Sequence, residues 1–166
     1  YLEEIAKDYY DNFTAKENSL VLYASKAFLS PSILSIIKKI GLGLDVVSGG
    51  ELYMAHKSGF PMEKVFLHGN NKTYEEIEMA LNYGVGRIVL DNDFEINQLN
   101  RIAKKKEKAV DVILRITPGI DAHTHDFIKT GHIDSKFGFT LQNGDALEGV
   151  KKTIESPYLN FKGLHC

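Results

Sequence analysis

The sequence lacks the features that would mark a secreted, membrane-spanning or nucleic-acid-binding protein. It has one cysteine, Cys166, so no internal disulfide can form, and we expect a reducing compartment such as the cytoplasm. No apolar run approaches the roughly 18–20 residues of a membrane span. The chain begins at Tyr1 with no charged-then-apolar leader to read. Its 20 basic and 22 acidic side chains give a net charge of −2, which argues against nucleic acid as the main partner.

What the sequence does contain is a regular alternation of short apolar runs and helical stretches. Six runs are expected to be strands, over residues 20–24, 44–47, 65–68, 87–91, 111–116 and 161–166. A polar stretch over 117–143 separates the last two. Strand, helix and strand at this period predict parallel βαβ units with right-handed crossovers, and therefore an α/β protein.

Helix starts are marked by side chains that can cap a helix. Ser30 precedes Pro31, and Thr73 with Glu76 forms a capping box. A second candidate box joins Asn92 and Glu95, which stand before another helical run. An earlier helix is expected over residues 2–13, with its apolar side chains on one face.

The strand ends favour a barrel over a doubly wound sheet. No G-x-G-x-x-G turn follows the first strand, as a dinucleotide-binding sheet would need. Polar residues stand instead at the carboxyl ends of five strands: Lys26, Ser48, His68, Asp91 and Arg115. A (β/α)8 barrel has eight strands and about 250 residues. We therefore expect residues 1–166 to form one incomplete domain, a partial (β/α)8 barrel of six strands.

Lys26 is the first candidate for chemistry. If the first strand continues through it, Leu22 and Ala24 share its face and place the base of the side chain among apolar groups. Desolvation would then favour the neutral amine, the form that attacks a carbonyl carbon. The alternative from spacing alone is a solvated lysine at a strand end.

Five blocks of the sequence resemble fold-type III pyridoxal-phosphate enzymes. They are Y-A-S-K-A at 23–27, G-L-D-V-V-S-G-G-E-L at 43–52, H-G-N-N-K at 68–72, D-A-H-T-H at 121–125 with T-G-H and S-K-F-G after it, and G-L-H-C at 163–166. In order and spacing they are similar to the diaminopimelate decarboxylase family. The resemblance implies a pyridoxal 5'-phosphate cofactor. It also implies that the end of the barrel and a C-terminal β domain lie outside these 166 residues.

The resemblance also implies roles for the strand-end residues. Lys26 would bind the cofactor covalently and act as the catalytic lysine. Arg115 would lie near the ring and phenolic oxygen of the cofactor, as a permanent cation suits. Asp45 would pair with Lys26 or Arg115, and His68 would face the cofactor from the rim. The alternatives are an Arg115 ion pair with Asp45 or Asp91, and a His68 that is simply hydrogen-bonded at its strand end.

The polar stretch carries histidines that also allow a metal reading. His123, His125, Asp126 and His132 could ligate zinc, as in metal-dependent barrel hydrolases. The other interpretation is that these side chains are hydrogen-bonded within a loop that covers the mouth of the active site. We favour this second interpretation and expect no metal. By resemblance, this loop approaches a dimer partner, and Lys136 lies at a homodimer interface.

The implied activity is decarboxylation of meso-2,6-diaminopimelate to L-lysine, an amino-acid biosynthetic reaction. A basic amino-acid decarboxylase or racemase of the same fold, a metal-dependent hydrolase and an inactive paralogue remain alternatives. Because parts that the family uses would follow Cys166, we expect residues 1–166 alone to be inactive and to bind the cofactor weakly.

Overall fold

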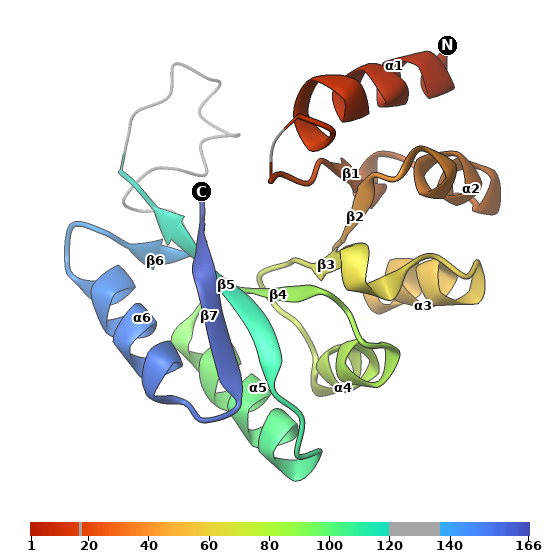
Figure 1. Ribbon diagram of the computed structural model, residues 1–166. Coiled ribbons are helices and arrows are strands. Elements are labelled where there is room, and N and C mark those ends of the chain that lie inside the picture. Colours follow the sequence, from red (N-terminus) through yellow and green to blue (C-terminus); the bar gives the residue numbers. More distant parts are fainter. Residues whose placement is uncertain (17, 120–136) are drawn as a thin grey trace.

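A computed structural model describes residues 1–16, 18–119 and 137–166 of the chain. Strands lie at the centre of the molecule, and helices form an arc outside them (Figure 1). The strands are β1 (Leu22–Ala24), β2 (Gly43–Val46), β3 (Val65–Leu67), β4 (Arg87–Leu90), β5 (Val110–Thr117), β6 (Phe139–Thr140) and β7 (Leu159–His165).

In the part of the chain that the structure describes, all the strand pairs are parallel and the sheet does not close. The order is β1-β2-β3-β4-β5, with β7 paired to β5 along its length and the short β6 paired to the end of β5. Within the described residues, β1 and β7 are edge strands. This confirms the expected α/β fold and a barrel portion of six main strands. The predicted strand limits agree with the structure to within two residues.

The helices are α1 (Leu2–Tyr9), α2 (Pro31–Ile40), α3 (Gly49–Lys57), α4 (Tyr74–Tyr83), α5 (Asp93–Lys105) and α6 (Asp145–Glu155). Three of the helices, α2, α4 and α5, begin where the capping residues predict. A short π-helix, Tyr10–Thr14, extends α1, and 3-10 turns span Ser25–Ala27 and Met62–Lys64. The side chains of Ser30, Thr73 and Asn92 each accept a hydrogen bond from a backbone N–H of the helix that follows.

The core lies between the sheet and the helices, and it takes every second residue of β2 to β5. These side chains are fully buried: Leu44, Val46, Val65, Leu67, Ile88, Leu90, Val112 and Leu114. Because successive side chains of a strand point to opposite faces, the residues between them face the inside of the open barrel. Asp45, His68, Asp91 and Arg115 belong to that inner set.

Two findings differ from the sequence-based expectation. The two-residue strand β6 lies within the polar stretch, where no strand was predicted. The apolar face of α1 is mostly exposed, with Leu2 and Tyr9 more than half exposed and only Ala6 buried. Since β1 is an edge strand here, α1 packs against α2 and lines an open apolar pocket of about 570 Å³.

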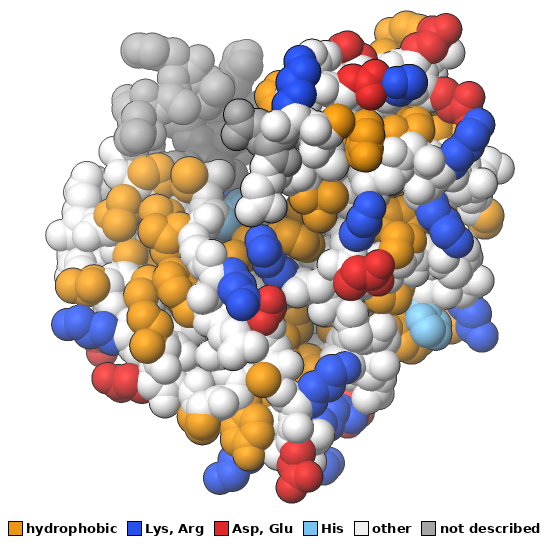
Figure 2. All heavy atoms as spheres, viewed as in Figure 1, with side chains coloured by type: hydrophobic (Ala, Val, Ile, Leu, Met, Phe, Trp, Pro, Cys, Tyr) orange, Lys and Arg blue, Asp and Glu red, His pale blue; other side chains and the backbone are white. Residues whose placement is uncertain are grey.

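A second apolar surface lies at the other end of the sheet. Figure 2 shows apolar side chains gathered over the region of α6, where Leu147 and Ile154 are exposed. Both apolar surfaces therefore flank edge strands. In the described part of the chain, no helix is both long and apolar enough to span a membrane.

Candidate functional site

Five polar side chains from five strands meet on the inner face, toward the carboxyl ends of the strands. They are Asp45, His68, Asp91, Arg115 and His165. Strand register places them together, since Arg115 pairs with His165 across β5 and β7. In parallel βα folds, the carboxyl ends of the strands carry the active site. This cluster is the candidate site.

Arg115 is held by Asp91, which follows β4 and is 2% exposed. The guanidinium Nη1 lies 3.1 Å from Asp91 Oδ1, and the other carboxylate oxygen accepts a hydrogen bond of 3.2 Å from the Gly138 backbone N–H. The guanidinium also lies over the ring of Phe137, 4.7 Å from its centroid. Of the readings for Arg115, the ion pair with Asp91 is therefore observed. It fixes the cation in place and leaves the cofactor role open.

Gly138 must be glycine for this contact. Its φ is +72°, and a Cβ there would lie 2.9 Å from the Arg115 carbonyl oxygen. That separation is shorter than van der Waals contact, so a side chain would push β6 away from β5. The sequence showed Gly138 only as part of the S-K-F-G block.

Asp45 lies beside His68, which corrects its predicted pairing. Its Oδ2 is 3.7 Å from His68 Nδ1, and among the described residues its ion-pair partner is neither Lys26 nor Arg115. The register explains this. Asp45 pairs with Phe66 on β3, so His68, two residues further along and on the same face, lies diagonal to it.

His165 belongs to the cluster and was not predicted as a site residue. Its ring contacts that of His68 edge to face, with centroids 4.6 Å apart. His68 Nε2 and His165 Nδ1 are buried and have no hydrogen-bond partner among the described residues. Burial lowers the pKa of His165 below its ordinary value of 6.5, and the nearby His68 and Arg115 add to the shift. The signal available in the sequence was its place at the end of the last strand.

Lys26 lies at the carboxyl end of β1, but its surroundings differ from the prediction. The chain leaves the strand at Ala24 and enters the 3-10 turn Ser25–Ala27, so Lys26 does not continue the face of Leu22 and Ala24. Its side chain is exposed rather than set among apolar groups. Its backbone is nevertheless anchored, because the buried Ser25 Oγ lies 2.7 Å from the Asp45 carbonyl oxygen.

Three glutamates tie successive βα loops to one another beneath this cluster. Each is the third residue of its helix: Glu51 in α3, Glu76 in α4 and Glu95 in α5. Each carboxylate accepts a hydrogen bond from a backbone N–H of its own loop, at Val47, Thr73 and Asp91 respectively. Each also accepts from the preceding loop, at Ser25, Gly49 and Lys72. The pattern of a capping side chain followed three residues later by Glu could have revealed all three.

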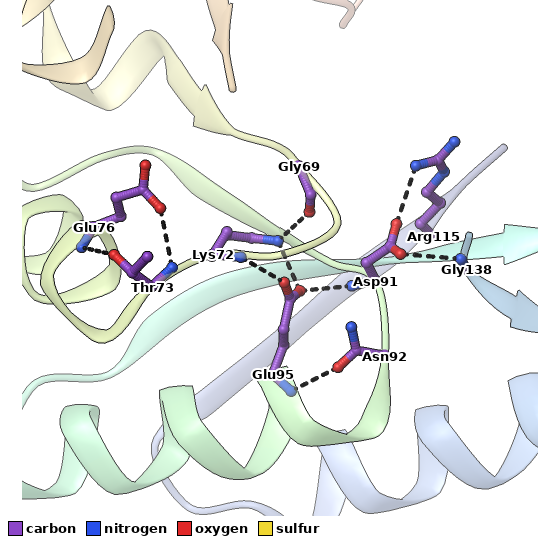
Figure 3. A network of polar contacts seen from close by, with 9 residues as sticks. All are labelled: Gly69, Lys72, Thr73, Glu76, Asp91, Asn92, Glu95, Arg115 and Gly138. Atoms are coloured by element: carbon purple, nitrogen blue, oxygen red, sulfur yellow. Dashed lines mark hydrogen bonds and ion pairs between the residues drawn. The ribbon is translucent and has the colours of Figure 1, made fainter. Parts of the chain in front are cut away.

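Glu95 departs from the capping box predicted for it. Asn92 does cap α5 by accepting from the Glu95 N–H at 3.0 Å, but the Glu95 carboxylate turns to Lys72 instead of the cap backbone (Figure 3). Lys72 Nζ donates to Glu95 Oε2 at 2.7 Å, and both side chains are 2% exposed. Burial lowers the pKa of Lys72, and the charge of Glu95 opposes that shift. Lys72 was part of a quoted block but had no predicted role.

The remaining predicted residues lie outside the described part of the chain. These are His123, His125, Asp126, His132 and Lys136, which belong to the range 120–136. Among the residues that the structure does describe, no group of three or more His, Cys, Asp or Glu side chains could hold a metal ion.

Enzymes built on a (β/α)8 barrel carry their active sites at the carboxyl ends of the strands. An open parallel βα sheet with a polar cluster at those ends is therefore typical of part of such a barrel. Residues 2–166 match the family described as "Pyridoxal-dependent decarboxylase, pyridoxal binding domain", and the chain belongs to this family.

The chain is similar to several diaminopimelate decarboxylases. It is 47% identical to that of Bacillus subtilis (strain 168) over 166 residues, which cover 99% of the chain and 38% of the relative. The structure of the Helicobacter pylori enzyme complexed with L-lysine superposes with a TM-score of 0.89 at 32% identity, over 98% of this chain and 41% of that one. The structure of the enzyme from "m. jannaschii" in co-complex with L-lysine superposes with a TM-score of 0.86 at 35% identity, over 99% of this chain and 39% of that one. The chain thus spans about two fifths of the length of these relatives.

Proposed function

We propose that residues 1–166 form an incomplete part of the cofactor-binding barrel domain of a pyridoxal-phosphate-dependent decarboxylase that converts meso-2,6-diaminopimelate to L-lysine. The observation that carries the proposal is the strand-end cluster, in which a fixed cation and two buried imidazole nitrogens, unpaired among the described residues, face the inside of the barrel. The similarity to diaminopimelate decarboxylases supports the choice of substrate.

The residues present fit pyridoxal phosphate. His68 Nε2 and His165 Nδ1 are buried polar atoms in need of a partner, and a buried polar atom is costly without one. Arg115 offers a permanent positive charge to an anionic oxygen of the cofactor. Lys26 offers an exposed primary amine at the end of β1 for covalent attachment. When bound, the cofactor supplies an electron sink for the pair of electrons that carbon dioxide leaves behind.

The chain's own residues would place and polarise this group. Asp91 holds the guanidinium of Arg115 in one position by ion pairing. Asp45 lies on the Nδ1 side of His68 and so orients the opposite nitrogen, Nε2, toward the interior. Ser25, held between Glu51 and the carbonyl of Asp45, fixes the turn that carries Lys26. Lys26 is the catalytic residue of the proposal, and Arg115, Asp45 and His68 are its cofactor-binding residues.

Covalent labelling tests the assignment of Lys26. The protein in its full natural length is incubated with pyridoxal phosphate, reduced with borohydride and digested, and the modified peptide is identified. The label should fall on Lys26 and vanish in Lys26→Arg. Lys72 is the internal control, because a lysine that is 2% exposed should stay unlabelled. A label on another lysine, with Lys26 unmodified, would contradict the assignment.

Substrate assays separate the proposed reaction from its relatives. Release of carbon dioxide from meso-2,6-diaminopimelate supports the proposal. Turnover of only lysine or ornithine would indicate a different basic amino-acid decarboxylase, and racemisation without carbon dioxide would indicate a racemase. Binding of zinc, with activity that depends on it, would support the metal-dependent alternative.

The proposal includes a homodimer in the cytoplasm, with an interface near Lys136. Sedimentation of the full-length protein, with Lys136→Glu as the variant, tests this part. A dimer that weakens in the variant is the expected outcome, and a wild-type monomer at assay concentration would contradict it.

A further inference from the structure

The buried pair of Lys72 and Glu95 lies outside the candidate site but is bonded to it. Glu95 Oε1 accepts from the Lys72 backbone N–H at 3.2 Å, and Oε2 accepts from Lys72 Nζ and, at 2.9 Å, from the Asp91 backbone N–H. Lys72 Nζ also donates to the Gly69 carbonyl oxygen at 2.6 Å. One carboxylate thus joins the loop after β3 to the first residue beyond β4.

Asp91 continues this chain of contacts into the site. Its backbone is held by Glu95, while its side chain holds Arg115 and the Gly138 N–H (Figure 3). The direction of the Asp91 carboxylate therefore depends on where Glu95 holds the backbone. Movement of Asp91 would move the guanidinium that it binds.

The charge state of the pair explains why two ionised groups are placed here. An ionised carboxylate accepts at both oxygens, whereas a protonated carboxyl or an amide loses part of that capacity. Lys72 Nζ and the Asp91 N–H both donate to Glu95 Oε2, so one carboxylate serves Lys72 and Asp91 together. Stability alone does not demand this arrangement, since well-packed apolar residues often replace a buried ion pair without loss.

We propose that Lys72 and Glu95 are a positioning pair that fixes Asp91 and, through Asp91, the guanidinium of Arg115 against the bound cofactor. This inference rests on the proposed function, because it assigns Arg115 to the cofactor. Neither Lys72 nor Glu95 touches the cofactor in this scheme.

The test follows the absorbance of the bound cofactor against pH in the full-length holoenzyme. A cation beside the phenolic oxygen of the cofactor favours its deprotonated form, so a displaced Arg115 should raise the pH midpoint of the absorbance change. Glu95→Gln and Asp91→Asn are each expected to raise it, Glu95→Gln by up to about 1 unit. If Glu95 acts through Asp91, the double variant should match Asp91→Asn alone.

Two further variants separate positioning from stability. Glu76→Gln alters the equivalent glutamate of α4, which does not contact Asp91, and should lower the melting temperature without moving the midpoint. Lys72→Met with Glu95→Gln removes both buried charges and keeps an acceptor for the Asp91 N–H. It serves as the second measurement if Glu95→Gln alone fails to fold, and it should raise the midpoint less than Asp91→Asn does.

The outcomes are distinct. Two results would overturn the positioning role and leave a purely structural pair. One is a midpoint that stays at the wild-type value in both Glu95→Gln and Lys72→Met/Glu95→Gln. The other is a shift in Glu95→Gln/Asp91→Asn that equals the sum of the two single shifts. A wild-type protein that shows no cofactor absorbance would instead overturn the proposed function itself.

Discussion

The first turns of α4 and α5 look alike in the sequence and differ in the structure. Thr73 and Asn92 each cap their helix by accepting from the N–H of a glutamate three residues on, at 3.2 and 3.0 Å. At α4 that glutamate, Glu76, returns the bond to the cap backbone and closes the box. At α5 the carboxylate of Glu95 is drawn away to Lys72 and Asp91.

The difference teaches that a local pattern decides the cap but not the fate of the carboxylate. Asn92 and Glu95 have the spacing of a capping box, and the Asn92 half of the box forms. The other half does not form, because the Glu95 carboxylate accepts from Lys72, 23 residues away in the sequence, and from the Asp91 N–H, one residue before the cap.

Removal of the two carboxylates should give the largest contrast between the helices. We expect Glu95→Ala to lower the free energy of unfolding by about 3–5 kcal/mol, because it leaves Lys72 buried without its partner. Urea unfolding of the full-length protein measures the loss. A cost of less than about 1 kcal/mol would mean that the pair is solvated and that the comparison fails.

Glu76→Ala should cost less, about 1–2 kcal/mol, because it removes an acceptor for the N–H groups of Thr73 and Gly49 but strands no buried charge. The same urea titration measures this loss of stability. Glu75→Ala, at an exposed position of α4, serves as a matched control. Equal costs for Glu76→Ala and Glu95→Ala would erase the distinction drawn here.

The caps themselves should behave alike, since this is the part that the two helices share. Thr73→Ala and Asn92→Ala are each expected to cost about 1 kcal/mol. Thermal unfolding of the two variants, measured under the same conditions, checks this. A much larger loss for Asn92→Ala would indicate that the cap of α5 also supports the Lys72–Glu95 pair.

A pH titration should give the smallest effect and should appear at α5 only. The pKa of Lys72 is lowered in the folded chain, so the unfolded chain binds more protons as the pH approaches 10.5. Stability contributed by Lys72 therefore rises with pH in the alkaline range below 10.5. Relative to Lys72→Met, wild type should gain stability from pH 7 to pH 10, while wild type minus Glu75→Ala, which alters an exposed carboxylate of α4, should stay flat. The opposite slope would show that Lys72 is more strongly charged when folded.

Much of the fold could be predicted because it follows from local chemistry. Ser30, Thr73 and Asn92 mark helix starts that the structure confirms, and apolar runs mark the six main strands. The two-residue strand β6 could not be predicted, because Phe139 and Thr140 form no apolar run and pair only where β5 extends to Thr117.

The candidate site could be predicted in part. Strand-end position brought His68, Asp91 and Arg115 to attention, Asp45 stood out as a carboxylate within a buried strand, and the structure groups all four. Their partners could not be assigned, because the register between β2 and β3 decides that His68 lies diagonal to Asp45, with its Nδ1 3.7 Å from the carboxylate.

Lys26 shows a different failure. Strand alternation cannot be extended through residues that leave the strand, and the 3-10 turn Ser25–Ala27 takes Lys26 out of the face of Leu22 and Ala24.

The three linking glutamates give the molecule an order of assembly. Glu51 bonds back to Ser25, Glu76 to Gly49, and Glu95 to Lys72, so every link runs from a later unit to an earlier one. A chain that emerges from the ribosome amino end first could therefore set each loop as soon as the following helix forms, without waiting for the carboxyl-terminal part. On this view the residues around Lys26 would be among the earliest to reach their final places during synthesis.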